Sequence, residues 1–151
     1  MRASQLVEPF PLVRLDDDGR EAARRMADEH RPGLIVLNEA GLPQAVLPGS
    51  QVLHFLIPGY VHEDPALARA LPESASDEMV EKLAHVPVRE LLSRHAERTE
   101  LPVVDGDATT IEVAALMART HSPLVAVVVD GACIGAITVS RLLRHLLGPQ
   151  S

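Results

Sequence analysis

Hydrophobic positions along this chain recur twice in the same order. In residues 131–147 an apolar run ends at Thr138 and leucines at helical spacing follow it, which predicts a strand, a tight turn and a helix. Residues 41–57 repeat that pattern without a gap when the two stretches are set ninety positions apart. Identical residues occupy four aligned pairs: Gly41/Gly131, Ser50/Ser140, Leu53/Leu143 and Leu56/Leu146. The chain is therefore predicted to consist of two copies of one structural unit.

The residues upstream of these stretches repeat as well, at a shift of 91 positions. Asp18 and Thr109 each precede a glutamate by three residues, which is the spacing of a helix capping box. An apolar stripe follows each cap and predicts a helix. The stripes are Ala22, Ala23, Met26 and Ala27 in the first copy and Val113, Ala114, Met117 and Ala118 in the second. A histidine and then a proline end both helices: His30 and Pro32, His121 and Pro123.

Short apolar runs at residues 34–37 and 124–129 predict strands that are buried on both faces. Asp130 and Gly131 predict a tight hairpin turn after the second of these runs. Each copy therefore reads as strand, helix, strand, strand, helix.

Two segments fall outside this order. Residues 4–13 are punctuated by prolines and are predicted to be extended, and residues 88–92 correspond to their start in the second copy. Residues 58–87 separate the copies. There Asp64 before a proline, and Ser76 before two acids, predict two short helices joined at residues 72–74. These helices could cover the core, a ligand cleft or a partner surface. We divide the chain into a first repeat (1–57), a helical linker (58–87) and a second repeat (88–151).

The amino-acid composition excludes several classes of function. The hydrophobic fraction of 46% allows a sizeable core, but aromatics are only 2% and Trp is absent, so that core is aliphatic. The net charge of -7 and the shortage of aromatic rings argue against nucleic acid. Cys133, the lone cysteine, sits in an apolar strand pattern and is predicted to be structural. Residues 1–10 show no secretory signal, and the longest apolar run is too short to cross a bilayer. We expect a soluble cytoplasmic protein that spans no membrane.

Taken together, these features resemble a tandem pair of cystathionine-β-synthase (CBS) domains, also called a Bateman module. The resemblance covers nearly everything outside residues 58–87. It rests on the repeated element order, on the Ala-Ala-x-x-Met helix, and on Gly-x-Ile-Thr at residues 135–138. It implies an α+β fold of two β-α-β-β-α repeats related by a pseudo-twofold axis, with two clefts between them. It also implies a non-catalytic sensor that binds adenosine-containing ligands, forms disc-like homodimers and regulates an attached or partner protein.

The family's ligand mark is a Thr or Ser followed three residues later by Asp at the start of the last helix. A carboxylate accepts hydrogen bonds from ribose hydroxyls, while the hydroxyl residue and the helix amides meet phosphate. The second copy has Thr138 but Arg141 in place of Asp, and the first copy has Pro48 and Gln51. Arginine has five donors and no acceptor, so it cannot hold a ribose diol as Asp does.

Each candidate residue has two interpretations. Thr138 contacts phosphate or ribose, or it only caps the last helix. Arg141 binds an anion at a helix N-terminus, or it is a solvated surface side chain. Gln51 contacts a ribose weakly, or it marks a degenerate first site.

The resemblance also places Ser122, Pro123 and Leu124 at the adenine slot. Their equivalents in the first copy include Arg31, which is either a phosphate contact or a helix-end charge.

No catalytic or metal-binding motif is visible. The seven histidines (His30, His54, His62, His85, His95, His121 and His145) show no close metal-ligand spacing. No glycine-rich phosphate loop, nucleophile elbow or triad signature occurs, so we expect neither an enzyme nor an essential cofactor.

The leading hypothesis is a stand-alone regulatory module that binds a small anionic ligand such as AMP, ADP, ATP or S-adenosylmethionine in the second-copy cleft. The alternative is a ligandless module with degenerate sites that forms a homodimer or binds a partner protein.

Overall fold

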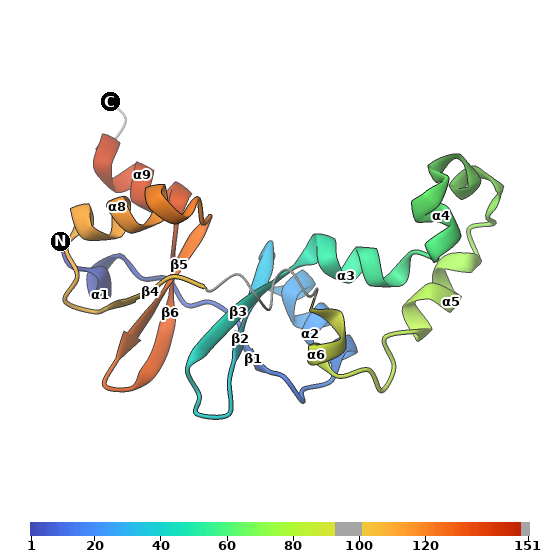
Figure 1. Cartoon of the computed structure of the whole chain (residues 1–151), viewed down its shortest axis with the longest axis horizontal. Coiled ribbons are helices and arrows are strands. Elements are labelled where there is room, and N and C mark those ends of the chain that lie inside the picture. Colours follow the sequence, from blue (N-terminus) through green and yellow to red (C-terminus); the bar gives the residue numbers. More distant parts are fainter. Residues whose placement is uncertain (93–100, 149–151) are drawn as a thin grey trace.

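The computed structural model describes residues 1–92 and 101–148. Two units of the same construction lie beside each other, and a helical segment projects from one end (Figure 1). The predicted α+β fold of two β-α-β-β-α repeats is confirmed. Within the described ranges, no helix is both long enough and apolar enough to cross a membrane.

The first unit is built on a three-stranded sheet of order β1-β2-β3. Strand β1 (Leu12–Arg14) runs parallel to β2 (Gly33–Leu37), and β2 runs antiparallel to β3 (Pro43–Pro48). Helix α2 (Gly19–Asp28) connects β1 to β2, and α3 (Gly49–Leu56) follows β3. Residues 33–36 of β2 are buried, as its continuous apolar run predicts for a strand covered on both faces.

The second unit has the same plan. Its sheet has the order β4-β5-β6, formed by β4 (Val103–Asp105), β5 (Leu124–Val129) and β6 (Ala132–Thr138). Helix α8 (Thr110–Thr120) lies between β4 and β5, and α9 (Val139–Leu147) follows β6. Asp130 and Gly131 both have left-handed backbone angles (φ 51° and 79°), which confirms the tight hairpin turn between β5 and β6.

The two sheets also share their register. Leu12 pairs with Ile35 in the first sheet, and the residues 91 positions later, Val103 and Ala126, pair in the second. Both antiparallel ladders shift register at the equivalent step, Val36/Leu37 and Val127/Val128. A repeat seen in the sequence is therefore a repeat in three dimensions, down to the same irregularity.

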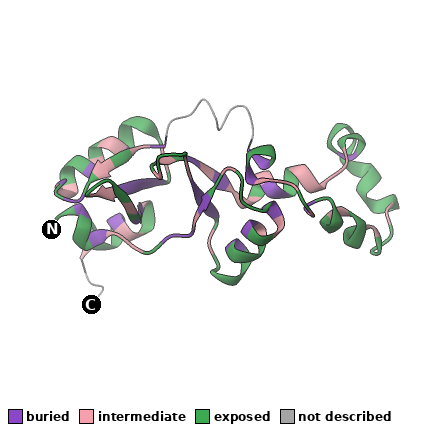
Figure 2. Ribbon diagram, turned by 90° about the horizontal axis from the view of Figure 1, so that it is seen from below, coloured by how far each residue is buried: buried purple, intermediate pink, exposed green. Residues whose placement is uncertain are grey.

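The core has three parts, one inside each unit and one between them. The central part joins buried residues of the two sheets and of the segments just before β1 and β4: Phe10, Ile35, Leu101, Leu124, Ala126 and Ala136. Burial follows the strands and the inner faces of the helices that cover them, whereas the projecting segment is mostly exposed (Figure 2). The two units are thus held together by an apolar layer between their sheets.

The short helices before each repeat are exchanged between the units. Helix α1 (Ala3–Leu6) packs in the core of the second unit, and α6 (Val88–Leu91) packs in the core of the first. Equivalent hydrogen bonds hold both: Ala3 N donates to Ala108 O at 2.8 Å, and Val88 N donates to Asp17 O at 2.9 Å. Each unit is therefore completed by the short helix that precedes the other unit in the sequence.

The helix boundaries follow the predicted caps. The Asp18 carboxylate accepts a hydrogen bond from Arg20 N at 2.9 Å, and Thr109 Oγ1 accepts one from Glu112 N at 3.2 Å. His30 and His121 both adopt φ 54°; His30 lies two residues past the end of α2, and His121 lies directly past the end of α8. A left-handed residue at this place ends a helix by turning the chain away from its axis.

Two expectations needed correction. Residues 4–13 are not extended throughout, because residues 3–6 form α1 against the second sheet. In the linker, α4 (Gly59–Glu63) was not predicted. The helix after Asp64 is the 3-10 helix η1 (Pro65–Ala70), and α5 (Ala75–Glu81) begins after Ser74 rather than after Ser76. The capping residues correctly indicated where these helices lie, but they did not predict the helix type of η1 or the first residue of α5. His95, one of the histidines considered as ligands, lies outside the described residues.

Candidate functional site

A cleft of about 460 Å³ lies where the two units meet. Equivalent parts of both repeats form its walls: the turn after α2 faces the turn after α8, and the end of β3 faces the end of β6. Its lining residues are Glu8, His30, Arg31, Pro32, Gly33, Val46, Pro48, Pro123, Leu124, Thr138, Val139, Ser140 and Arg144. Its volume falls within the usual range for small-molecule sites.

Thr138 lies at the end of β6 and caps α9. Its Oγ1 accepts a hydrogen bond from Arg141 N at 3.2 Å and lies 3.2 Å from Ser140 Oγ. The first turn of α9 contains no acidic residue. The cleft therefore meets the positive end of a helix dipole and two hydroxyl groups.

Arg141 has its guanidinium turned toward the N-terminal segment. Its Nε donates to Leu6 O at 3.2 Å and lies 3.8 Å from Glu8 Oε1. Arg141 is not among the described residues that line the cleft. The anion it meets within the chain is the Glu8 carboxylate.

Arg31 reaches the same carboxylate from the first repeat. Its guanidinium lies 3.4 Å from Glu8 Oε2, donates to Pro9 O at 2.9 Å and stacks 5.4 Å from the centre of the Phe10 ring. Glu8 therefore stands between one arginine of each repeat. Both contacts to its carboxylate are long, so most of its acceptor capacity is available to a ligand in the cleft.

Backbone pairing fixes the position of Glu8. Glu8 N donates to Ala136 O at 2.9 Å, and Ala136 N donates to Glu8 O at 3.1 Å. The close approach depends on Gly135, which has φ 146° and where a Cβ atom would lie 2.1 Å from Glu8 O. The Gly-x-Ile-Thr motif thus contributes to the cleft in two ways. Its glycine leaves room for the backbone of Glu8, and its threonine caps α9.

The structure brings together four of the seven candidate residues: Arg31, Pro123, Leu124 and Thr138. Ser122 and Gln51 lie outside the described lining of the cleft. The Ser122 hydroxyl donates instead to Leu124 O at 2.6 Å, closing a local turn.

Sequence reasoning missed Glu8, His30, Ser140 and Arg144 as cleft residues. For Arg144 and Ser140 the signal was present, because both lie on the helix that carries the ligand mark. No local pattern marks Glu8, whose place depends on a distant strand.

The first repeat begins its last helix differently. Pro48 precedes α3, and α3 has no hydrogen bond from a side-chain cap. A Cβ atom on Gly49 would lie 3.1 Å from Met26 Sδ, so the start of α3 is close to its own core. Of these two helix starts, the one in the second repeat therefore supplies the hydroxyl groups of the cleft, Thr138 and Ser140.

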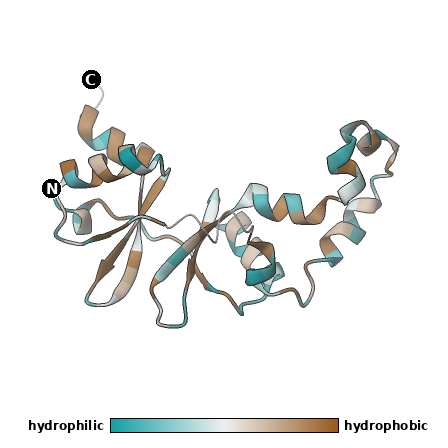
Figure 3. Cartoon of the chain, in the orientation of Figure 1, coloured by the Kyte–Doolittle hydropathy of each residue, from teal (hydrophilic) through white to brown (hydrophobic). Residues whose placement is uncertain are grey.

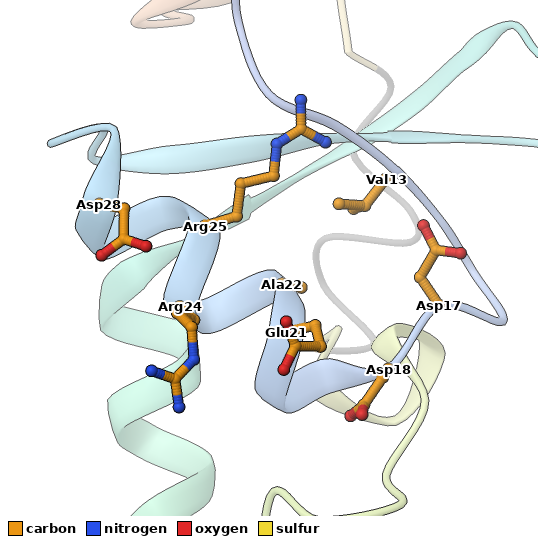
Figure 4. Close-up of a pocket in the computed structure, with 8 residues that line it drawn as sticks. All are labelled: Val13, Asp17, Asp18, Glu21, Ala22, Arg24, Arg25 and Asp28. Atoms are coloured by element: carbon orange, nitrogen blue, oxygen red, sulfur yellow. The ribbon is translucent and has the colours of Figure 1, made fainter.

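A second hollow of about 550 Å³ runs along α2 and is lined by charged residues. Figure 4 shows the charged side chains of α2 pointing in different directions rather than converging on one point. Several already have partners: Asp18 caps the helix, and Arg25 donates to Leu12 O at 2.8 Å and pairs with Glu29 at 3.0 Å. This hollow is a solvated helix face, and we do not assign it a ligand.

Metal-binding geometry is not found in the described part of the chain, where no three His, Cys, Asp or Glu side chains gather. His54 and His62 stack with ring centres 4.1 Å apart, and His62 Nε2 lies 2.9 Å from His54 O. Cys133 is free and half-buried, and burial raises the pKa of its thiol.

Comparison with known proteins gives a consistent answer. The family model of the CBS domain matches residues 88–148. A crystal structure described as a CBS domain-containing protein of unknown function from Kribbella flavida is 52% identical. That alignment covers 98% of this chain and 99% of that one, with a TM-score of 0.90. None of the curated proteins compared with the chain matches it.

More distant structures share the fold. The CBS domain of a CBS domain-containing membrane protein from Sphaerobacter thermophilus is 21% identical, with a TM-score of 0.72 over 95% of this chain and 86% of that one. The protein CBSX2, solved in complex with AMP, is 16% identical, with a TM-score of 0.63 over 97% of this chain and 96% of that one.

Proposed function

The chain belongs to the CBS domain family as a tandem pair of repeats, and from this membership we propose that it is a non-catalytic regulatory module for a small anionic ligand containing a ribose. The ligand binds in the cleft between the repeats. AMP, ADP, ATP and S-adenosylmethionine are the candidates, and the AMP complex of a protein with the same fold makes this class the first to test.

One observation supports the proposal: the same cleft is lined by an acceptor and by donors, the two kinds of group that a ribose phosphate needs. Glu8 supplies the carboxylate that the ligand mark lacks at Arg141. The hydroxyls of Thr138 and Ser140 offer donors to a phosphate at the positive end of the α9 dipole, and Arg144 adds a positive charge. Pro123 and Leu124 give the base an apolar wall.

The arrangement also explains how binding could regulate. Arg31 lies in the first repeat and Thr138 in the second, and both line the same cleft. A ligand that touches both stabilises one relative arrangement of the repeats and shifts the population toward it. Such a role requires a partner that distinguishes the arrangements, and we expect a homodimer, a regulated protein, or both. The proposed location is the cytoplasm.

Thermal unfolding with AMP, ADP, ATP, S-adenosylmethionine and NAD tests the proposal. At a hundred times its dissociation constant, a ligand specific for the folded state adds about 2.7 kcal/mol, which raises the midpoint by roughly 5–10 °C. We expect such a shift with at least one of them. The absence of any shift at millimolar concentrations would contradict the proposal.

Glu8→Gln tests the role of the carboxylate. The amide keeps the size of the side chain but weakens its acceptor strength toward a diol. We expect the active nucleotide to bind roughly tenfold to a hundredfold more weakly, as for the loss of a charge-assisted hydrogen bond. Inorganic phosphate, which offers no diol, should bind as before or more tightly. Glu21→Gln, in the hollow along α2, is the matched control. Tighter nucleotide binding by Glu8→Gln would show that Glu8 competes with phosphate instead.

A ligandless assembly module is the second candidate. Pro48 and Gln51 favour it, because the first repeat offers neither a carboxylate nor a capping hydroxyl at its helix start. A dimer that is unchanged by every nucleotide, and by Arg141→Ala, would support this alternative.

A further inference from the structure

Two arginines interrupt the repeat, and both face the Glu8 carboxylate. Arg31 stands where the second repeat has Ser122, and Arg141 stands where the first repeat has Gln51. Neither charge is needed to build a unit of this fold, because the equivalent unit lacks it. The two arginines come from different repeats, and each lies within 4 Å of a Glu8 oxygen. Their shared feature is therefore this one carboxylate.

Each arginine contacts one oxygen of Glu8 and one backbone carbonyl beside it. Arg31 Nη1 lies 3.4 Å from Glu8 Oε2, and its Nη2 donates to Pro9 O at 2.9 Å. Arg141 Nε lies 3.8 Å from Glu8 Oε1 and donates to Leu6 O at 3.2 Å. A guanidinium can serve two acceptors at once because it has five donors in a planar fork. The arginines therefore hold both the side chain of Glu8 and the backbone on either side of it.

The strand next to Glu8 offers the carboxylate no charged partner. Glu8 pairs through its backbone with Ala136 of β6, and neither β5 nor β6 contains a charged residue. Figure 3 shows these two strands as hydrophobic along most of their length. The side chains of Glu8, Arg31 and Arg141 are only 28%, 27% and 39% exposed, so water screens their attraction less than it screens a fully exposed pair.

Arg141 acts on the cleft from outside it. Glu8 and Arg31 line the cleft, whereas Arg141 is not among the described lining residues. We propose that Arg141 is a positioning residue, which holds the Glu8 carboxylate at the cleft from the second repeat as Arg31 does from the first. This inference rests on the proposed function, because it names the residue that keeps the ribose acceptor in place. The departure from the ligand mark at Arg141 then serves the ligand through Glu8.

The arrangement makes ligand affinity depend on both repeats. Arg31 follows α2 of the first repeat, and Arg141 lies in α9 of the second. A movement of one repeat relative to the other takes one arginine away from Glu8 and frees one of its oxygens. Because coupling between two equilibria is reciprocal, a ligand that uses the positioned carboxylate stabilises the present arrangement by the same factor.

A double-mutant cycle tests the positioning role, with AMP affinity measured by isothermal titration calorimetry. Arg141→Gln alone should weaken AMP binding about threefold to tenfold, which is less than the effect of Glu8→Gln, because a displaced carboxylate still accepts part of the time. In the Glu8→Gln background the same substitution should change the affinity by less than about twofold, since the carboxylate that it positions is gone. Arg119→Gln, at an exposed arginine in the last turn of α8, is the matched control and should have no effect.

Inorganic phosphate separates positioning from direct anion binding. Because phosphate has no diol, its affinity should change by less than about twofold in Arg141→Gln at 0.15 M salt. If Arg141 bound the phosphate itself, or only stabilised the fold around the cleft, AMP and phosphate would weaken together and the two substitutions would be additive. Either result would overturn the inference. Tighter AMP binding by Arg141→Gln would overturn it too, because Arg141 would then withhold Glu8 from the ligand.

A measurement without ligand separates the inference from its premise. The Glu8 amide donates to Ala136 O, and its hydrogen exchange should become about threefold faster or more in Arg141→Gln, with the amides of α8 unchanged. Unchanged exchange at Glu8 would show that Arg141 does not hold it, and the proposed function would stand. If the unmodified protein binds no AMP, the proposed ligand is wrong and the exchange rate alone decides whether Arg141 holds Glu8. If circular dichroism shows that Arg141→Gln fails to fold, Arg141→Lys repeats the test, because it keeps the charge without the planar fork.

Discussion

Helices α3 and α9 occupy equivalent places in the two repeats but begin in different ways. Thr138 caps α9 through its hydroxyl, whereas Pro48 offers α3 no side-chain hydrogen bond. One turn further on, Val52 and Leu142 are buried in both helices. In these two helices the repeats agree at the buried position and differ at the capping position, which borders the cleft. The buried position therefore maintains the scaffold, and the difference in capping makes the two sides of the cleft unequal.

The largest expected effect concerns the exchanged helices, where the two repeats agree most closely. Leu6→Ala and Leu91→Ala should each lower the free energy of unfolding by about 2–5 kcal/mol, because both leucines are buried. Denaturant unfolding measures the loss, and Ile111→Ala, at an exposed position, is the control. Hydrogen exchange should show Leu6→Ala weakening β5 and Leu91→Ala weakening β2. Loss of protection in the opposite sheets would refute the exchange.

Gly135 and Ala45, which are equivalent by register, provide the next test. Gly135→Ala should cost about 2–4 kcal/mol, since its Cβ atom collides with the Glu8 carbonyl and its backbone is strained. Ala45→Gly should cost only about 1 kcal/mol. Denaturant unfolding compares the two. If the two variants lost the same free energy of unfolding, the pairing of Glu8 with β6 would not be the reason for a glycine at position 135.

A smaller effect is expected at the helix caps. Thr138→Ala should lower the free energy of unfolding by about 1 kcal/mol through the lost cap of α9, and Thr138→Ser should restore it. Ligand affinity should follow the same order, with Thr138→Ser close to the unmodified protein and Thr138→Ala weaker. Full ligand binding by Thr138→Ala would mean that the hydroxyl only caps the helix.

The smallest effect concerns Cys133, which stands at the position of Pro43 in the first repeat. Because burial raises the pKa of its thiol, less of it is thiolate at neutral pH than in a free cysteine. Alkylation by iodoacetamide should therefore be slow at pH 7 and become faster as the pH rises toward that pKa. Fast modification at pH 7 would indicate a reactive thiol rather than a structural one.

The sequence predicted the strands and main helices because each carries its own signal: a cap, an apolar stripe or a buried run. It missed α1 because the partner of that helix lies in the other repeat. It missed Glu8 for a similar reason, since a strand far along the chain positions that carboxylate. The departures at Arg141 and Gln51 were visible in the sequence. Glu8, the residue that could compensate for them, was not visible, because its position depends on backbone pairing with a distant strand.

A crystal structure of the protein grown with AMP tests the central claim most directly. We predict one nucleotide per chain in the cleft between the repeats, with its ribose at Glu8 and its phosphate at Thr138 and the start of α9. A nucleotide bound instead outside that cleft, or with its ribose away from Glu8, would contradict the account.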